Sequence, residues 1–597
     1  MDYYRDTPEW AVLFKNAVDW DTIIPVYYPS FPTPEGFTNK EEVISFYEEL
    51  VASIGKWAGT SLRERAGELD RVGSGTLKND AFIPSEPLAK TYREAKELGL
   101  FSLLPGPEYG GMGVPAVVAW LAMEQVCRAC SSTSIQLGFF LAFEDMIERF
   151  CPKETRDRLI PKIMNGELSG SMCLTEPGAG SDVGAIKTRA VKQADGTYLL
   201  NGAKIFISNG GGGLGFVLAR TPGAPEGLKG ISLFLVEEWL GDRHNYRITK
   251  LEEKMGLHGS ATCEVVYENT TAQLVGEENH GFQIMLHLMN EARIGVGIQG
   301  IGGIEGSLDR VSEYAQTRMQ FGKPLVEHSL YKRNLTDWET ERDAIRVLMI
   351  EALCSFDVYQ KLDMKKRHTG DLTEPESALY KKALRKTRHL TPLVKFYGSE
   401  AYAEISKKAI QGFGGYGFIG EYQIERYHRD SFGALLYEGT SQIQSLMAMK
   451  DFLKFSFRRP TRFLQIIMAN HPLGNLVTSS NEFERGFRNV HYEFNKNLAL
   501  LLLRTVTGSE ATDKNVGFEL TKWLQSRPSL KMDEKKVNRL IVHAETFCQG
   551  LAYVETLRAL KKHAVKDPAA QGALFERYRR LVVPRLAAIY SDWKQPR

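Results

Sequence analysis

The chain has 597 residues, which is too long for one hydrophobic core and predicts three or four domains. Hydrophobic residues make up 43% and charged residues 25%, as in ordinary soluble globular proteins. The net charge of +2 is unevenly spread, because residues 454–597 carry 25 Lys and Arg against 13 Asp and Glu, whereas the first 453 residues carry 50 against 60.

An acidic body with a basic tail indicates an anionic partner for the tail, either a membrane surface or a nucleic acid. The first residues have neither the apolar core of a signal peptide nor the character of a transit peptide, and apolar runs such as 498–503 are too short to span a bilayer. The seven cysteines are an odd number, which favours reduced thiols in a cytoplasmic protein. Cys127 and Cys130 have no second pair and no nearby His, so no metal site is predicted.

Residues 1–40 are rich in aromatic residues and Pro, show little periodicity, and are expected to form an arm packed on the body. Residues 41–168 are predicted to form a helical domain. Within it, 41–57 and 87–98 place apolar residues three to four positions apart, and Gly99 is the expected end of the second helix.

The period changes at about residue 169, and residues 169–277 are predicted to form a small β domain. Strands are expected at 171–174, 216–220, 231–236 and 264–267. Residues 198–200 and 204–208 are expected to pair as a hairpin around an Asn201-Gly202 turn. Helical periodicity then returns and predicts a helical domain at 278–457 and a helical extension at 458–597.

The stretch 436–444 places Glu438 where a loop ends and a helix begins, with Thr440 or Ser441 as the cap of that helix. A carboxylate at this point has the apolar face of Tyr437 on one side. On the other side it has free backbone N–H groups and the positive end of a helix dipole. This suits a base that removes a proton beside a carbonyl whose oxygen becomes enolate-like. An ordinary capped helix start is the alternative interpretation of these nine residues.

Two stretches match the pattern G-x-G-x-x-G, one at 210–215 and one at 412–417. The dinucleotide-binding motif needs a strand, a glycine turn and a helix in succession. The first match lies between two predicted strands and the second lies within a helical block, so neither predicts a Rossmann fold. Glycines still let a backbone approach a phosphate closely, so the second match can contact a cofactor in another geometry.

Five segments, taken together in their order and spacing, resemble the acyl-CoA dehydrogenase family: 174–182, 254–260, 318–322, 411–417 and 437–442. The resemblance runs from about residue 40 to residue 455, and the long basic extension is similar to that of the larger, long-chain-type members. It implies an α+β, mostly α fold. The parts would be an N-terminal helical domain, a small middle β-barrel or sandwich domain, a C-terminal four-helix-bundle domain and an extra helical C-terminal extension.

The resemblance implies an FAD-dependent acyl-CoA dehydrogenase that desaturates a fatty acyl-CoA thioester between Cα and Cβ, the first step of β-oxidation. Glu438 would take the α-proton while a β-hydride passes to flavin N5. The α-proton is too weak an acid for a free carboxylate. The site must therefore hydrogen-bond the thioester carbonyl and raise the pKa of Glu438 by desolvation. The N–H of Gly439 or Glu438 is one expected donor, and the flavin ribityl chain supplies the second in this family.

In the β domain, the resemblance places Leu174 and Thr175 at the pyrimidine edge of the flavin and Ser208 toward its N5. Ser181 would lie near the phosphates or the pantetheine arm of the substrate. Phe206 takes the place usually filled by Trp, which keeps an aromatic wall against the ring. Without the resemblance, Phe206 would be interpreted as a core aromatic, and Thr175 and Ser208 as turn or cap residues.

The resemblance assigns the remaining positions to the cofactor and the substrate. Those for the cofactor are Arg318, Gln320 and Phe321 at the FAD of the neighbouring subunit, Gln411, Gly414 and Gly415 at its adenosine–pyrophosphate half, and Thr440 and Gln442 near the flavin diphosphate. Tyr437 and Arg293, with Ser181, are the expected substrate contacts. A flavin site that spans two chains implies that a monomer would bind FAD poorly. A homodimer is expected, because in the larger family members the extra C-terminal domain occupies the surface by which smaller ones form tetramers.

Some family members carry their catalytic Glu on an earlier helix, immediately before an Arg. Arg293 matches that Arg, but Ala292 precedes it. Glu291 is one position further back, which turns it about 100° around a helix. Glu438 is therefore the predicted base.

The expected electron acceptor is an electron-transferring flavoprotein, and the nearest alternative is an acyl-CoA oxidase that reacts with O₂. A DNA-binding flavoprotein of the same fold is a second alternative, but the intact 437–440 segment argues for chemistry, so nucleic acid is not expected as a partner. A cytoplasmic location is expected. Peripheral contact with the inner face of a membrane is a hypothesis that rests on Lys561, Lys562, Lys566, Arg577, Arg579, Arg580 and Arg585. Its alternative is a solvated basic face that supports the dimer.

Overall fold

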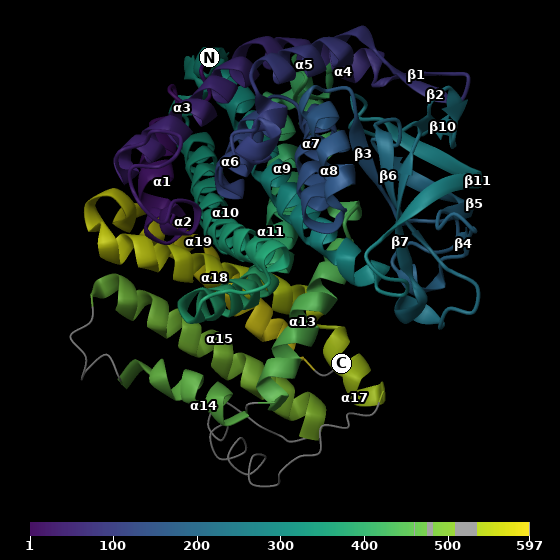
Figure 1. The fold of residues 1–597 in the computed structure, drawn as a ribbon. Coiled ribbons are helices and arrows are strands. Elements are labelled where there is room, and N and C mark those ends of the chain that lie inside the picture. The colour runs from purple at the N-terminus through teal and green to yellow at the C-terminus, as the bar shows by residue number, and fades with distance from the viewer. Residues whose placement is uncertain (459, 474–480, 508–533, 596–597) are drawn as a thin grey trace.

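The computed structural model describes residues 1–458, 460–473, 481–507 and 534–595. Most of the described chain is helical, with one large mixed sheet. In Figure 1 long helices occupy the centre, the sheet lies to one side, and the helices of the extension lie together below. This architecture agrees with the predicted fold class.

The N-terminal part is helical as predicted, but the arm is more ordered than its sequence pattern indicates. Its elements are α1 (Pro8–Ala17), α2 (Trp20–Tyr27), α3 (Lys40–Trp57), α4 (Arg63–Val72), α5 (Glu86–Glu97), α6 (Ala116–Ala129), α7 (Ser131–Phe150) and α8 (Lys153–Met164), with a hairpin of β1 (Gly75–Lys78) and β2 (Ala81–Pro84). α1 and α2 are two to three turns long, too short to show a clear period, and the core holds them through Trp10, Phe14 and Trp20. Gly99 follows α5 in a left-handed conformation, as expected of a helix stop.

The large sheet has the strand order β3-β6-β7-β11-β5-β4, and β10 also pairs with β11. The strands are β3 (Ser169–Cys173), β4 (Arg189–Lys192), β5 (Tyr198–Ser208), β6 (Gly213–Ala219), β7 (Ser232–Glu237), β10 (Arg247–Leu251) and β11 (Thr262–Val275), and β8 (Trp239–Leu240) pairs with β9 (Arg243–His244) beside them. The strands predicted at 171–174, 216–220, 231–236 and 264–267 correspond to β3, β6, β7 and β11.

The predicted hairpin at Asn201-Gly202 is wrong, because β5 runs through both residues without reversing. β11 pairs antiparallel along β5, with Gly202 opposite Tyr267, and the register shifts just beyond that point. The Asn201 side chain bonds across the strands, since its Oδ1 accepts the Asn269 N–H at 3.0 Å. A long partner strand satisfies the backbone groups that a tight turn would have satisfied, so the Asn-Gly pair marks an irregular step in a strand.

The helical domain after the sheet contains the longest helices. They are α9 (Gly281–Thr317), α10 (Ser329–Thr369), α11 (Glu374–Phe413), α12 (Ile424–Leu436) and α13 (Ser441–Arg458), with a small hairpin of β12 (Met319–Gln320) and β13 (Lys323–Pro324). α11 packs along both α9 and α10. α9 and α11 pack closely at Gly300, where an added Cβ would lie 2.5 Å from the Gly398 carbonyl oxygen. Only glycine fits at this crossing.

The extension is helical where the structure describes it, with α14 (Pro460–Ala469), α15 (Glu482–Thr507), α17 (Glu534–Ile541), α18 (Ala544–Lys566) and α19 (Pro568–Trp593). α18 and α19 pack on α10, and α18 also contacts α11 and α13 (Figure 1). None of the helices in the described ranges is long and apolar enough to span a membrane.

Part of the basic surface predicted for the extension is used inside the fold. Arg585 pairs with Glu341 at 2.6 Å, and Lys562 pairs with Glu351 at 3.2 Å, so both attach the extension to α10. Arg579 pairs with a neighbour on its own helix at 2.7 Å. The structure therefore gives the membrane-contact hypothesis no support, because these cations stabilise contacts within the protein.

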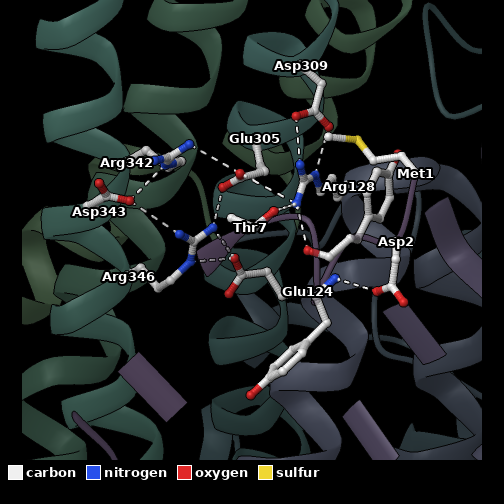
Figure 2. A network of polar contacts seen from close by, with 12 residues as sticks. Met1, Asp2, Thr7, Glu124, Arg128, Glu305, Asp309, Arg342, Asp343 and Arg346 are labelled. Atoms are coloured by element: carbon white, nitrogen blue, oxygen red, sulfur yellow. Dashed lines mark hydrogen bonds and ion pairs between the residues drawn. The ribbon is translucent and has the colours of Figure 1, made fainter. Parts of the chain in front are cut away.

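A buried ion network ties the arm to α6, α9 and α10 (Figure 2). Its charged members are Glu124, Arg128, Glu305, Asp309, Arg342, Asp343 and Arg346. Arg128 donates to both carboxylate oxygens of Asp309, each at 2.7 Å, and to the Thr7 hydroxyl of the arm at 3.1 Å. Arg346 donates to Glu124 at 2.8 Å and is fully buried. These contacts fix α6, α9, α10 and the arm relative to one another.

We expect Arg346→Ala to lower the free energy of unfolding by about 3–5 kcal/mol, because it leaves the buried Glu124 carboxylate without an ion-pair partner among the described residues and removes one of the three Arg partners of Glu305. Lys153→Ala is the matched control, since Lys153 forms an exposed ion pair with Asp157 that should contribute less than about 1 kcal/mol. Urea unfolding followed by circular dichroism measures both. Equal midpoints for the two variants would show that the network does not hold the fold.

Candidate active site

The turn between α12 and α13 has an unusual backbone. Glu438 has φ +57° and Gly439 has φ +91°, so both lie in the left-handed region. That conformation is uncommon for a residue other than glycine, and it persists where the surroundings enforce it. Here the Gln444 amide donates to the Glu438 carbonyl at 2.9 Å and to the Gly439 carbonyl at 3.1 Å. The Arg293 guanidinium donates to the same Glu438 carbonyl at 3.2 Å.

The backbone N–H groups of the turn indicate that it binds an external hydrogen-bond acceptor. Thr440 caps α13, since its hydroxyl accepts the Ile443 N–H at 3.4 Å, whereas the Ser441 hydroxyl donates to Glu400 instead. Within the described ranges, neither the Glu438 N–H nor the Gly439 N–H donates to an acceptor in the protein. Both therefore remain available to an external oxygen at the positive end of α13.

Two buried cations, Arg293 and Lys395, act electrostatically on the Glu438 carboxyl. Burial raises the pKa of Glu438 to about 7, and the charges of Arg293 and Lys395 oppose that rise. Burial likewise lowers the pKa of Lys395 to about 8, opposed by the carboxylates of Glu438 and Glu400. Arg293 is 3% exposed and Lys395 is fully buried, whereas Glu438 keeps part of its surface open. A carboxyl with a pKa near 7 suits a general base.

The alternative carboxylate on α9 faces elsewhere. Glu291 is buried, and its pKa is raised well above the usual value by burial and by the nearby Asp145, with Arg149 opposing. One of its oxygens has no hydrogen-bond partner in the part of the chain that the structure describes. Glu291 therefore lies against α7, as expected from its position one residue away from that of the alternative base.

Three further residues position the turn, and none of them is among the predicted site residues. The Tyr437 hydroxyl donates to Gln299 on α9. Gln444 hydrogen-bonds the carbonyls of the turn, and the positive charge of Lys395 lowers the pKa of Glu438. Gln299 and Gln444 have no distinguishing sequence signal, because each is one polar residue in a helical pattern. Lys395 has one, since it is the only charge in the apolar stretch 390–398.

The predicted flavin-face residues lie together in the sheet. The carbonyl of Thr175 accepts the Ile205 N–H at 2.9 Å, which places the end of β3 beside β5. The carbonyl of Leu174 accepts from the buried Lys204 ammonium at 3.0 Å. Phe206 has φ +58° and is 62% exposed, so it is a surface aromatic and not the core aromatic of the alternative interpretation. Ser208 follows two residues later, opposite Thr262 on β11.

A loop of the β domain joins this face to α12, the helix that ends just before Glu438. The Leu257 N–H donates to Asp430 on α12 at 2.6 Å, and Arg429 donates to the Met255 carbonyl at 3.4 Å. The loop leads directly into β11, the partner of β5. Ser181 lies apart from these contacts and is exposed in the loop after β3.

A second group of predicted cofactor residues, called here the Arg318 group, lies at the end of α9. Arg318 lies over the ring of Tyr416 at 5.4 Å, and Tyr314 stacks on Phe413 with ring centroids 4.3 Å apart. These contacts place Arg318 beside the glycine turn that follows α11. The exposed residues of this group are Gln320, Phe321, Gln411, Gly414 and Gly415. Gln442, at the start of α13, is also exposed.

The two groups are separate within one chain. Among the described residues, no hydrogen bond, ion pair or ring contact joins the Arg318 group to Phe206 or Ser208. Phe321 is 94% exposed at φ +48°, at the tip of the β12–β13 hairpin. A side chain of that kind is available to a second molecule.

The chain matches three family models in succession. They are the acyl-CoA dehydrogenase N-terminal domain over residues 47–167, the middle domain over 171–270 and the C-terminal domain over 279–453. An acyl-CoA dehydrogenase of Bacillus subtilis is 33% identical over 365 residues, which cover 60% of this chain and 89% of the relative. A 3-methylmercaptopropionyl-CoA dehydrogenase of Ruegeria pomeroyi is 33% identical over 464 residues, which cover 72% of this chain and 76% of the relative.

A solved structure extends the likeness to the C-terminal part. The acyl-CoA dehydrogenase of Bacillus anthracis, complexed with FAD, matches with a TM-score of 0.72 at 21% identity. The match covers 97% of this chain and 91% of that one. The fold of the helical extension is thus shared, as well as that of the three domains before it.

We expect Lys395→Met to raise the pKa of Glu438 above its value of about 7, by roughly one unit, because it removes one of the two cations that favour the carboxylate. Infrared titration of the protonated carboxyl band, with Glu438→Gln as the reference that lacks it, measures the shift. Lys382→Met, an exposed Lys on the same helix, is the control and should leave the pKa unchanged. A Lys395→Met titration that matches the wild type would show that Lys395 does not act on Glu438.

Proposed function

The chain belongs to the acyl-CoA dehydrogenase family, and on that premise we propose that it desaturates a fatty acyl-CoA between Cα and Cβ with Glu438 as the base. Family membership confirms the predicted FAD-dependent oxidoreductase. The observation that carries the proposal is the turn at Glu438, where a desolvated carboxyl and two unpartnered backbone N–H groups lie side by side.

The residues of the site fit a flavin. Phe206 offers an exposed aromatic face beside Thr175, and its left-handed backbone is a strain that a binding site explains. Gly414 and Gly415 have open space where a Cβ would stand, so a pyrophosphate can approach the backbone. The Arg318 Nε has no partner in the described part of the chain. FAD bound with its ring against Phe206 of one chain, and held by Arg318, Gly414 and Gly415 of a second chain, would supply the acceptor for the hydride that leaves Cβ.

Glu438 would accept the α-proton at its carboxylate. The thioester carbonyl would lie at the N–H groups of Glu438 and Gly439, which stabilise the charge that develops on its oxygen. Gln444 and Arg293 occupy the carbonyls of the same turn, so its orientation is fixed before substrate binds. A base whose pKa is raised to about 7 is stronger than a solvated carboxylate and is still ionised above neutral pH.

We assign the Arg318 group to the FAD of a second chain in a homodimer. The support is the exposed apolar surface formed by Met319, Phe321, Phe418 and Ile419, of which Phe321 is 94% and Phe418 89% exposed. Exposed apolar clusters of this kind mark contacts with another molecule. Family resemblance gives the rest of the assignment, including the electron-transferring flavoprotein that would reoxidise the cofactor. Rapid oxidation of the reduced enzyme by air would favour the oxidase alternative instead.

We expect Glu438→Gln to abolish flavin reduction by acyl-CoA while the fold and FAD content remain intact, since the amide is nearly isosteric but cannot accept the α-proton. Anaerobic stopped-flow mixing with acyl-CoAs of graded chain length measures the bleaching of the flavin band. Glu291→Gln is the matched control and should keep a rate near that of the wild type, because Glu291 faces α7. The assignment of Glu438 as the base fails if Glu438→Gln reduces its flavin at the wild-type rate and Glu291→Gln does not.

Arg318→Ala should lower FAD occupancy after dialysis and weaken self-association, because Arg318 anchors the group that we assign to the partner's cofactor. Absorbance ratios give the occupancy, and analytical ultracentrifugation gives the oligomeric state. Arg333→Ala is the control, since that exposed Arg pairs with Asp337 on α10. Wild-type occupancy and mass in Arg318→Ala would argue against a flavin site shared between chains.

A further inference from the structure

A large cavity in the C-terminal part of the molecule is lined by residues of α11, α13, α14, α15 and α18. Figure 1 shows where these helices lie. Its volume is about 740 Å³, within the range typical of small-molecule sites. Its inner wall is apolar and aromatic, with Phe463 and Phe494 nearly fully buried and Phe452 packed against Phe463 at 5.7 Å. A wall of this kind suits a hydrocarbon chain.

The polar side of the cavity carries an excess of positive charge. Its cations are Arg385, Arg388, Arg462 and Arg558, and its carboxylates are Asp451 and Glu555. Both carboxylates are already paired, Asp451 with Arg388 at 3.3 Å and Glu555 with Arg558 at 3.0 Å. Arg385 and Arg462 form no ion pair with any residue in the described ranges. Among the described residues, the exposed guanidinium groups of Arg385 and Arg462 are therefore left without a carboxylate partner, and Arg385 donates only to the Lys381 carbonyl at 3.1 Å.

A buried, neutral histidine forms part of the wall of the same cavity. The Arg558 guanidinium, which has only donors, lies 3.0 Å from the His491 Nε2, so that nitrogen accepts and the proton of the ring is on Nδ1. Burial and the charge of Arg558 lower the pKa of His491 to about 4, which keeps the ring neutral at pH 7. The His491 Nδ1 has no partner among the residues that the structure describes.

The cavity is distinct from the site at Glu438, although one helix connects them. α13 begins three residues after Glu438 and reaches the cavity at Asp451, Phe452 and Phe455. At 1.5 Å per residue these side chains leave the helix about 15–21 Å beyond its start. The cavity can therefore be occupied independently of the active site.

We propose that this cavity binds a fatty acid, with the hydrocarbon chain against Phe452, Phe463 and Phe494 and the carboxylate at Arg385 and Arg462. The Arg fork matches a carboxylate in geometry as well as charge. Two unpaired guanidinium groups suit one carboxylate better than the several phosphate charges of coenzyme A. The assignment does not rest on the proposed dehydrogenase activity, since no residue of the active site lines the cavity.

The test uses the full-length enzyme with FAD and a dansyl-labelled undecanoate as the fluorescent probe. Arg385→Glu/Arg462→Glu should weaken probe binding about tenfold or more, since a hydrogen bond to a charged group is worth roughly that factor. Arg577→Glu/Arg580→Glu is the matched control, because it changes the net charge equally at two exposed positions on α19. It should bind the probe within about twofold of the wild type. Ala469→Trp, which places a large side chain at the cavity rim, should also weaken binding.

Laurate should displace the probe from the wild type, and lauroyl-CoA should displace it less well. The proposal is overturned if the wild type does not bind the probe or if the Arg385→Glu/Arg462→Glu variant binds it as the control does. It is also overturned if lauroyl-CoA competes better than laurate, which would place the probe in the acyl site beside Glu438. Flavin reduction by acyl-CoA, measured on the same variants, should stay at the wild-type rate and reports on the active site separately.

Discussion

The close crossing of α9 and α11 is the constraint on which the active site depends. At Gly300 an added Cβ would lie 2.5 Å from the Gly398 carbonyl oxygen and would force the two helices apart. Arg293 lies about two turns before this point on α9, and Lys395 lies about one turn before it on α11. The crossing therefore brings two buried cations to one carboxyl. Burial alone would keep Glu438 protonated at neutral pH, and full exposure would make it a weak base. Burial raises the pKa of Glu438, the two cations lower it, and together they set a pKa of about 7.

Strained backbone occurs at the predicted FAD positions as well as at the base. Glu438, Phe206 and Phe321 all have positive φ, a conformation that costs free energy and that the surrounding contacts enforce. Each lies at a position that the family resemblance assigns to substrate or FAD. Phe206 is fixed by the pairing of β5 with β11, and Glu438 by Gln444 and Arg293. Phe321 projects from a hairpin into solvent, which is consistent with a contact to a second chain.

The sequence predicts the order of domains and the position of Glu438 because both depend on local signals, periodicity in one case and a loop–helix junction in the other. The hairpin at Asn201-Gly202 was mispredicted because the pairing of β5 with β11, about 65 residues away, outweighs the local turn preference. Gln299 and Gln444 could not be identified for a similar reason, since their roles arise only from helix packing. The helices of the arm were missed because aromatic burial, and not an amphipathic period, holds them.

The pH dependence of flavin reduction tests the central claim most directly, because Glu438 must lose its proton before it can accept one from Cα. The apparent second-order rate constant, measured by anaerobic stopped-flow mixing at low acyl-CoA concentration, reports the ionisation of the free enzyme. We predict a rate that rises about tenfold per pH unit at low pH and levels off above a midpoint near 7, the pKa of Glu438. A flat profile, or a midpoint near 4.5 as for an exposed carboxyl, would contradict a desolvated Glu438 as the base.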